Sequence, residues 1–179
     1  MVALGHTRDD QAETFLLRLL RGAGARGLAA MHPSHGRIVR PLLDCRRRDL
    51  QAYLRDAGIE SLRDETNDDL AVPRNRVRRE LVPLLAERFN PSIVDVLADE
   101  AALARSEWAW MTEVAAAVEA GIRRDEAGTC RLDARALAGQ PDALARLVLR
   151  RAMGRAARGG DVAFAHVEQA LELARQGGA

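Results

Sequence analysis

A long helical repeat of apolar residues is the feature that most restricts how this chain can fold. From residue 93 to about residue 123, apolar side chains recur every three or four positions, which is the spacing of one face of an α-helix. An Arg-rich amphipathic pattern over 74–89 precedes this repeat, and further helical patterns near 141–156 and 162–176 follow it. From about residue 70 onward, the sequence therefore predicts a mainly α-helical domain.

The first 60 residues have a different pattern. Short apolar runs at Met1–Leu4 and 36–43 alternate with helical patterns at about 10–21 and 47–57. This alternation predicts the order strand, helix, strand, helix, with the first strand buried in a parallel sheet. The glycines of residues 21–27 are expected to end the first helix and form a loop.

A polar, acidic stretch over 60–73 ends in a proline and is typical of a linker or surface loop. We therefore predict an α/β segment with its linker over residues 1–70. A helical linker and a central helical domain follow over 71–179, and the chain as a whole is expected to be mostly helical.

Composition and charge narrow the class of protein. Apolar residues make up 47% and charged residues 30% of the chain, as in a folded globular protein rather than a disordered one. The formal net charge is +1, so the overall charge of the chain does not indicate a polyanionic partner. No apolar run approaches the ~20 residues of a membrane-spanning helix, and no signal-peptide pattern opens the chain. We therefore expect a cytoplasmic protein.

The stretch GHTRDDQAET, residues 5–14, lies where the first predicted strand gives way to the first predicted helix. Asp10, Glu13 and Thr14 fall on one face of that helix, which Thr7 or Asp9 would cap. Open α/β sheets bind ligands at the carboxyl ends of their strands, and two carboxylates there suit Mg²⁺ or an ammonium group. Acidic residues at a helix N-terminus also simply stabilise the helix. Spacing alone leaves both interpretations open.

A second charged pattern, VPRNRVRRELVPLL, covers residues 72–85. Arg74 and Arg78 are four positions apart on a helix, so they share one face and could bracket a phosphate group. The alternative is a solvated basic face whose arginines pair with nearby acidic residues, for which the candidates are Asp68, Asp69 and Glu80.

Four separated segments together resemble one family. They are GHTRDDQAETFLLRLLRGAGARGLAAM (5–31), VRPLLDCRRRDLQAYL (39–54), DETN (64–67) and RNRVRRELVPLL (74–85). In order, spacing and content they resemble tRNA(Ile)-lysidine synthase, an N-type PP-loop ATP pyrophosphatase with an adenine nucleotide alpha-hydrolase-like α/β domain. Residues 120–176 are similar, more loosely, to the helical domain that follows in the same family.

The resemblance implies a ligase reaction in two steps. ATP adenylates C2 of the wobble cytidine of tRNA(Ile) and releases pyrophosphate. The amine of free L-lysine then displaces AMP and forms lysidine. The implied cofactors are ATP and Mg²⁺, the implied partners are tRNA(Ile) and free lysine, and a homodimer is left open as an assembly.

The resemblance also implies roles for individual residues. The H-x-x-D-D-Q-x-E-T pattern implies catalytic roles for His6, Asp10 and Glu13, with Asp10 also a metal ligand. Nucleotide or substrate binding is implied for Asp9, Gln11 and Thr14. The R-N-R-x-R pattern implies the same for Arg74, Asn75, Arg76 and Arg78.

One family motif has no counterpart in the 179 residues, namely the phosphate-binding loop Ser-Gly-Gly-x-Asp-Ser. We therefore expect the chain to be a piece of a longer synthase, or to begin too late at Met1, and to be inactive by itself. Two other functions remain open. One is a non-catalytic tRNA-binding helical module. The other is a different PP-loop tRNA-modifying enzyme such as a 2-thiocytidine synthetase, against which the lack of a C-x-x-C pair counts.

Overall fold

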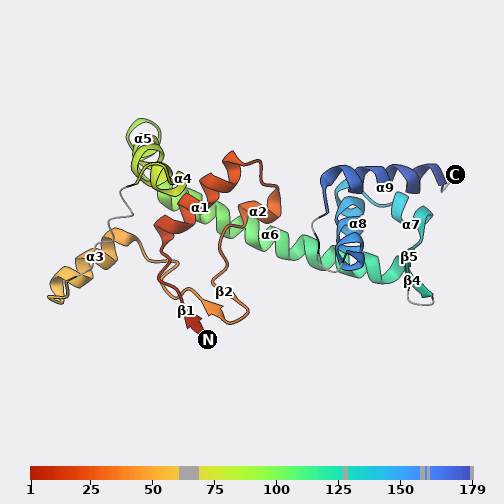
Figure 1. Cartoon of the computed structure of the whole chain (residues 1–179), viewed down its shortest axis with the longest axis horizontal. Coiled ribbons are helices and arrows are strands. Elements are labelled where there is room, and N and C mark those ends of the chain that lie inside the picture. The colour runs from red at the N-terminus through yellow and green to blue at the C-terminus, as the bar shows by residue number, and fades with distance from the viewer. Residues whose placement is uncertain (61–68, 127–128, 158–159, 161, 178–179) are drawn as a thin grey trace. The chain divides into compact units, whose positions relative to one another are not determined.

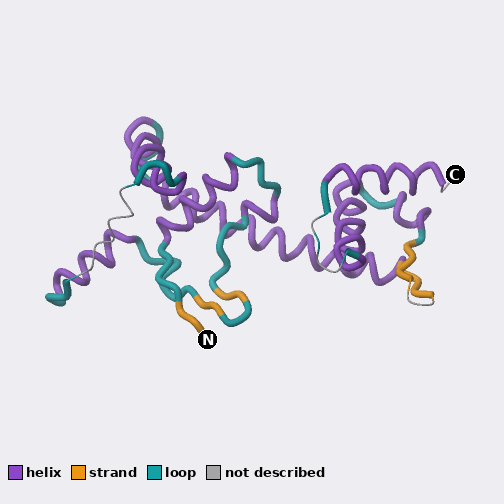
Figure 2. Tube along the Cα trace, viewed as in Figure 1, coloured by secondary structure: helices purple, strands orange, loops and turns teal. Residues whose placement is uncertain are grey.

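The computed structural model describes residues 1–60, 69–126, 129–157, 160 and 162–177 (Figure 1). Its contacts divide the chain into two compact units, Met1–Trp108 and Ala109–Ala179. Helices dominate the described residues, and the strands are short (Figure 2), which confirms the prediction of a mostly helical chain with an α/β part. The predicted domains, 1–70 and 71–179, stay a prediction, and the DETN segment lies outside the described residues.

The first unit begins with the predicted order of strand, helix, strand and helix, to which one strand and one short helix are added. Its elements are β1 (Val2–Ala3), α1 (Arg8–Leu20), α2 (Ala25–Leu28), β2 (Ser34–His35), β3 (Ile38–Val39), α3 (Arg47–Asp56), α4 (Pro73–Arg76), the π-helical turn η2 (Val77–Leu81), α5 (Val82–Arg88) and the first part of α6 (Ile93–Ile122). The sheet has the order β1-β3-β2, with β1 parallel and β2 antiparallel to β3.

Helix α1 starts where the sequence predicts because its first turn is capped on both sides. Thr7 is the N-cap, and its hydroxyl accepts a hydrogen bond from the backbone N–H of Asp10. The Asp10 carboxylate in turn accepts from the backbone N–H of Thr7 at 2.8 Å. This reciprocal capping box satisfies two donors that the first turn leaves without helical partners. Of the two predicted caps, Thr7 is confirmed.

The prediction of a buried first strand is wrong for this structure, since Val2 is 56% exposed. The apolar face of α1 does not cover the sheet. Instead, Ala12, Phe15 and Leu16 of α1 pack against Val77 of η2 and against the first part of α6. The helix therefore buries its apolar side among other helices, and the two-residue strand β1 keeps its side chains in solvent.

Two boundaries in the first unit also differ from prediction. The strand predicted over 36–43 is confined to Ile38–Val39, and the Gly-rich segment contains the short helix α2. Side chains of two helices hold carbonyl groups in and just after this segment: Arg18 of α1 donates to Gly27, and Arg105 of α6 donates to Met31 at 3.1 Å. These long-range bonds order a segment whose glycines alone predict a loop.

The Arg-rich helix predicted over 74–89 forms, but it contains a π turn over η2. The turn ends just before Pro83, which has no N–H to donate to the carbonyl group of Arg79 and whose ring would clash with that group in a regular α-helix. Widening the helix immediately before a proline relieves this clash, and such turns are frequent at functional sites.

The second unit contains the later part of α6 together with β4 (Arg123–Glu126), β5 (Thr129–Leu132), α7 (Ala134–Ala138), α8 (Asp142–Ala156) and α9 (Phe164–Gly177). The helices predicted near 141–156 and 162–176 are confirmed. The antiparallel hairpin β4–β5 and helix α7 were not predicted. None of the described helices is both long and apolar enough to cross a membrane.

Helix α6 supplies side chains to both cores, because its apolar stripe runs through nearly its whole length. Leu97 and Ala101 are buried in the first core, and Ala115 and Ile122 are buried in the second. Ala101 and Ala115 are fully buried, and their small side chains allow neighbouring elements to pack close to α6.

A buried ion pair fixes α8 to α6 inside the second unit. Glu119 of α6 is 3% exposed, and its carboxylate pairs with Arg151 at 3.3 Å and with Arg155 at 3.0 Å. A buried carboxylate without partners costs far more than a buried amide, since only the carboxylate carries a charge.

We therefore expect the double variant Arg151→Met/Arg155→Met to lower the free energy of unfolding by about 3 kcal/mol. Glu119→Gln keeps a neutral acceptor and is expected to cost about 1 kcal/mol. Urea titrations of both variants measure the difference, and Arg150→Met, at an exposed neighbour, is the control. Equal losses in the two variants would contradict a dominant role for the buried charge.

Candidate functional site

The site lies in the first unit, where β1 ends and α1 begins. Hydrogen bonds between β1 and β3 continue beyond the strands, since the N–H of Leu4 donates to the carbonyl of Val39 at 2.9 Å. This pairing brings the residues that follow each strand, His6 and Arg40, next to each other. The predicted position of His6 at the carboxyl end of a strand, beside a helix N-terminus, is confirmed.

Asp10 and Glu13 lie side by side on α1, and three guanidinium groups converge on them. Oδ1 of Asp10 accepts hydrogen bonds from Arg47 at 2.9 Å, Arg74 at 3.1 Å and Arg78 at 3.1 Å. Glu13 accepts from Nε of Arg78 at 2.7 Å and from Nε of Arg74 at 3.0 Å. We call these five residues the carboxylate–arginine cluster.

The cluster is only partly open to solvent. The side chain of Glu13 is 3% exposed and that of Asp10 is 11% exposed, whereas the three arginines are 26–33% exposed. The carboxylates therefore form the floor of the cluster and the guanidinium groups form its solvent side. Two negative and three positive side chains give the cluster a net charge of +1 when all are ionised.

Hydrogen bonds and nearby charges favour the ionised forms of Asp10 and Arg78 in the cluster. Burial raises the pKa of Asp10, but the hydrogen bonds from Thr7 and the charges of Arg47 and Arg74 outweigh it, so the pKa is lowered from 3.8. The hydrogen bond to Glu13 raises the pKa of Arg78 despite burial, which keeps its guanidinium charged.

The structure shows acidic partners of Arg74 and Arg78 that the sequence did not suggest. The two arginines share a face, as predicted, and both pair with the two carboxylates that GHTRDDQAET places on α1, about 60 residues away in sequence. Of the nearby acidic residues considered as partners, Asp68 lies outside the described residues. Two patterns that were separate in the sequence therefore form one cluster.

The other predicted site residues take less direct positions. Asp9 accepts from the backbone N–H of Arg47 at 2.8 Å and so caps α3, not its own helix. The amide of Gln11, which is 2% exposed, bonds at both ends to the backbone of Met31. The Thr14 hydroxyl donates to the backbone carbonyl of Asp10 at 2.7 Å.

The two remaining predicted residues come from α4. Asn75 is buried and donates to the backbone carbonyl of Asp69 at 2.8 Å. Arg76 is exposed. In this structure Asn75 therefore shapes the start of α4, while Arg76 is exposed to solvent.

Sequence reasoning missed Arg47 and Arg40. Arg47 is one of three consecutive arginines at the start of α3, and only the chain path shows that it reaches Asp10. Arg40 follows β3 and donates from Nε to Nδ1 of His6 at 3.2 Å. The family-like segment RPLLDCRRR contains both residues, but nothing in its letters distinguishes Arg47 from Arg46 or Arg48.

A second ionic network holds the first turn of α1 against α6. Arg8 donates to Asp95 at 2.8 Å, and Arg46 donates to Asp95 at 2.6 Å. Burial raises the pKa of Asp95, but the hydrogen bond from Arg8 and the charge of Arg46 outweigh it and lower that pKa. This network positions α1 and the start of α3 around the site.

The arrangement at Asp10 does not fit a divalent cation. Oδ2 accepts hydrogen bonds from Thr7, and Oδ1 faces three guanidinium groups whose charge repels Mg²⁺. Among residues that the structure describes, no group of three or more His, Cys, Asp or Glu side chains gathers to hold a metal. The predicted metal role of Asp10 stays a prediction that this geometry does not support. Guanidinium forks are instead suited to phosphate oxygens.

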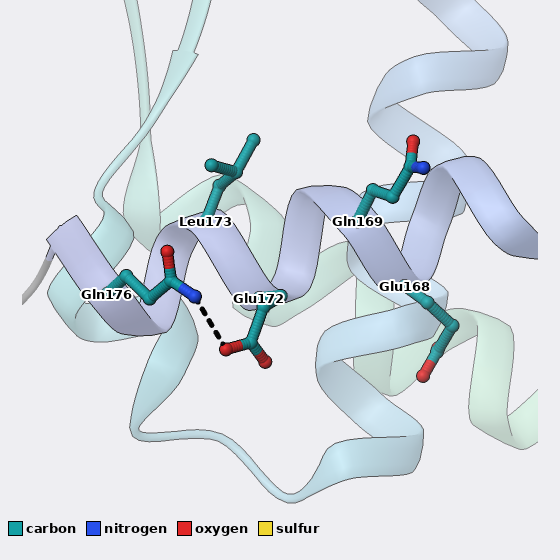
Figure 3. A pocket seen from close by; sticks show the side chains of 5 residues that line it. All are labelled: Glu168, Gln169, Glu172, Leu173 and Gln176. Carbon is teal, nitrogen blue, oxygen red and sulfur yellow. Dashed lines mark hydrogen bonds between the residues drawn. The ribbon is translucent and has the colours of Figure 1, made fainter.

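A pocket on the second unit is a weaker candidate. Its lining comes from α9 alone, with Glu168, Gln169, Glu172, Leu173 and Gln176 (Figure 3). Its polar groups are engaged with neighbours: Glu168 pairs with Arg146, and Gln176 donates to Glu172 at 2.8 Å. No set of polar groups converges on one point there, unlike in the carboxylate–arginine cluster.

Comparison with known proteins places the segment that contains the cluster in a domain family. Residues 1–85, which include the whole cluster, match the model of the PP-loop domain. Residues 1–85 therefore carry a PP-loop domain, as the motifs in this part of the chain indicated.

The relatives narrow this assignment, since the chain is homologous to tRNA(Ile)-lysidine synthases. It is 42% identical over 178 residues to the synthase of Solibacter usitatus, covering 97% of this chain and 40% of that relative. Identity to the synthase of Thermobifida fusca is 45% over 150 residues, covering 84% of this chain and 45% of the relative. For Geobacter sulfurreducens it is 42% over 178 residues, covering 93% and 36%. The chain thus spans about two fifths of the length of these relatives.

The lowered pKa of Asp10 makes a prediction about acid stability. Ionised Asp10 stabilises the folded chain above pH 3.8, and this contribution is lost as the pH falls through the lower folded-state pKa. At neutral pH, Asp10→Asn should lower the free energy of unfolding by about 2 kcal/mol. In acid the difference from the wild-type chain should shrink toward zero.

Urea unfolding across this pH range measures the effect. Asp49→Asn is the control, because Asp49 lies on α3 with a 65% exposed side chain and should change stability little. A loss for Asp10→Asn that is independent of pH would contradict the electrostatic explanation.

Proposed function

We propose that this chain forms part of the active site of a tRNA(Ile)-lysidine synthase. In the proposed reaction, the oxygen on C2 of the wobble cytidine attacks the α-phosphate of ATP, so that an O–P bond forms, pyrophosphate leaves and C2 carries an adenylate group. The ε-amine of free lysine then attacks C2, AMP leaves, and the proton lost by the amine passes to a base. The observation that carries the proposal is the convergence of Arg74 and Arg78 with Asp10 and Glu13 within the segment similar to the synthases.

The arginines are the proposed phosphate ligands. Arg47, Arg74 and Arg78 form the solvent side of the cluster, and guanidinium groups bind phosphate oxygens in bidentate fashion. There they would stabilise the negative charge that develops on the leaving pyrophosphate. We propose that any Mg²⁺ enters bound to the ATP phosphates, since Asp10 is already bonded to cations.

Asp10 and Glu13 are the proposed ligands of the lysine ammonium group. Both are buried carboxylates whose present partners are cations, so the site already balances negative charge with positive charge. When phosphate draws the arginines toward itself, the carboxylates need another cation. The ammonium group of lysine meets that need, so the binding of the two substrates would be coupled.

The remaining motif residues are proposed to support this site. Asp9 and Thr14 hold backbone groups next to the cluster, Gln11 anchors α1, and Asn75 shapes the start of α4. Arg76, which is exposed, is the proposed contact for the tRNA backbone.

A chimera tests the function directly. In it, the matching 150 residues of this chain replace those of the Thermobifida fusca relative, and lysidine is measured after incubation with tRNA(Ile), ATP, Mg²⁺ and lysine. We expect the chimera to form lysidine. A folded chimera that binds tRNA and ATP but forms none would contradict the proposal.

Within this chimera, Arg47→Met should slow lysidine formation by about 100-fold, because one donor to the developing charge is lost. Arg48→Met is the matched control: Arg48 is the next residue on α3, its side chain is 74% exposed, and it pairs with Asp49 on the surface. Equal rates for the two variants would exclude Arg47 from the site.

The 179 residues alone are proposed to form no lysidine, because they contain no Ser-Gly-Gly-x-Asp-Ser sequence. Incubating the chain with the same four components tests this. Lysidine formation at the rate of the chimera would show that the motif is dispensable.

A further inference from the structure

The hydrogen bond between Arg40 and His6 has a consequence for the chemistry of His6. Arg40 is itself fixed, because Nη1 donates to the backbone carbonyl of His32 at 2.7 Å and its backbone N–H donates to Pro33 at 2.8 Å. From this position, Nε of Arg40 donates to Nδ1 of His6 at 3.2 Å. The two residues are brought together by the parallel pairing of β1 with β3.

A guanidinium group donates hydrogen bonds and does not lose its proton near neutral pH. Nδ1 of His6 must therefore act as an acceptor, which requires that it carry no proton. The single proton of the neutral imidazole is then on Nε2. An imidazolium would place an Nδ1–H group against the N–H of a cation, which is unfavourable.

Burial and the neighbouring charged groups shift the pKa of His6 in opposite directions. Burial lowers the pKa of His6 most, the charge of Asp10 on α1 raises it, and the charges of Arg40 and of Arg74 on α4 lower it. The pKa is lowered on balance, so the imidazole is neutral at physiological pH. Charge and hydrogen-bond geometry therefore agree.

We propose that Arg40 is a positioning residue that holds His6 as the neutral Nε2–H tautomer, so that His6 serves the site as a hydrogen-bond donor and not as its base. This inference rests on the proposed function and deepens it. The Nε2–H group suits an anionic oxygen, such as a phosphate oxygen of the nucleotide. Proton acceptance from the lysine amine then falls to a group other than His6, since Nδ1 is covered by Arg40.

Nitrogen-15 NMR of the chain itself tests the tautomer without substrates. Two-bond correlations from the imidazole C–H protons distinguish a protonated from an unprotonated ring nitrogen, and His6→Gln assigns the signals. At pH values above the titration of His6, we expect Nδ1 to be unprotonated and Nε2 to be protonated. Finding the proton on Nδ1 in the wild-type chain would overturn the proposal, and this measurement requires no variant at position 40.

Variants at Arg40 test whether this residue sets the tautomer of His6. Arg40→Met should raise the pKa of His6 and mix the two tautomers, because both the donor and its charge are lost. Arg40→Lys, which restores a charged donor, should return the spectrum toward the wild type. Arg37→Met is the matched control, since Arg37 is exposed and lies three residues earlier in the same hairpin. Unchanged His6 signals in Arg40→Met would overturn the role of Arg40.

Activity of the chimera separates this inference from the proposed function. If every chimera is inactive, the proposed function fails while the NMR result still decides the tautomer. If the chimera is active and His6 carries its proton on Nδ1, only the present inference fails. When both hold, Arg40→Met should slow lysidine formation and Arg40→Lys should restore it, because mixing the tautomers removes the Nε2–H donor from part of the His6 population.

Discussion

The pairing of two carboxylates on α1 with three arginines from other elements organises the first unit. Glu13 is almost completely buried, and burying a carboxylate is costly unless cations and hydrogen bonds surround it. Arg47 of α3 and Arg78 of η2 meet this requirement from 34 and 65 residues away in sequence. The start of α3 and the Arg-rich helix are thereby both tied to the same face of α1, beside the end of β1.

The same pairing makes the cluster suitable for chemistry. Its floor is negative and buried, its solvent side is positive, and its net charge is +1, so a ligand with both phosphate and ammonium groups could replace the internal pairs. The surrounding contacts are rigid, because Asp9 caps α3 and Arg8 and Arg46 hold Asp95. A site built in this way keeps its geometry while its charges change partners.

Much of the fold could be predicted because its causes are local. Apolar spacing located α6, α8 and α9, and the Thr7 and Asp10 capping box started α1 where the motif indicated. The exposure of Val2 could not be predicted in this way, because it depends on where α1 buries its apolar face. The π turn before Pro83 was missed as well, although the proline offered a local signal.

By itself, the sequence determined the longer helices α1, α3, α6, α8 and α9, the carboxylates at the first turn of α1, and the motifs that indicate the family. Only the tertiary structure decided which of the 27 arginines neutralise those carboxylates. Arg46, Arg47 and Arg48 are identical in type and adjacent in sequence, yet they pair with Asp95, with Asp10 and Glu13, and with Asp49 respectively. Ion pairing acts through space, so the partner of each charge is set by the path of the chain and not by the letters around it.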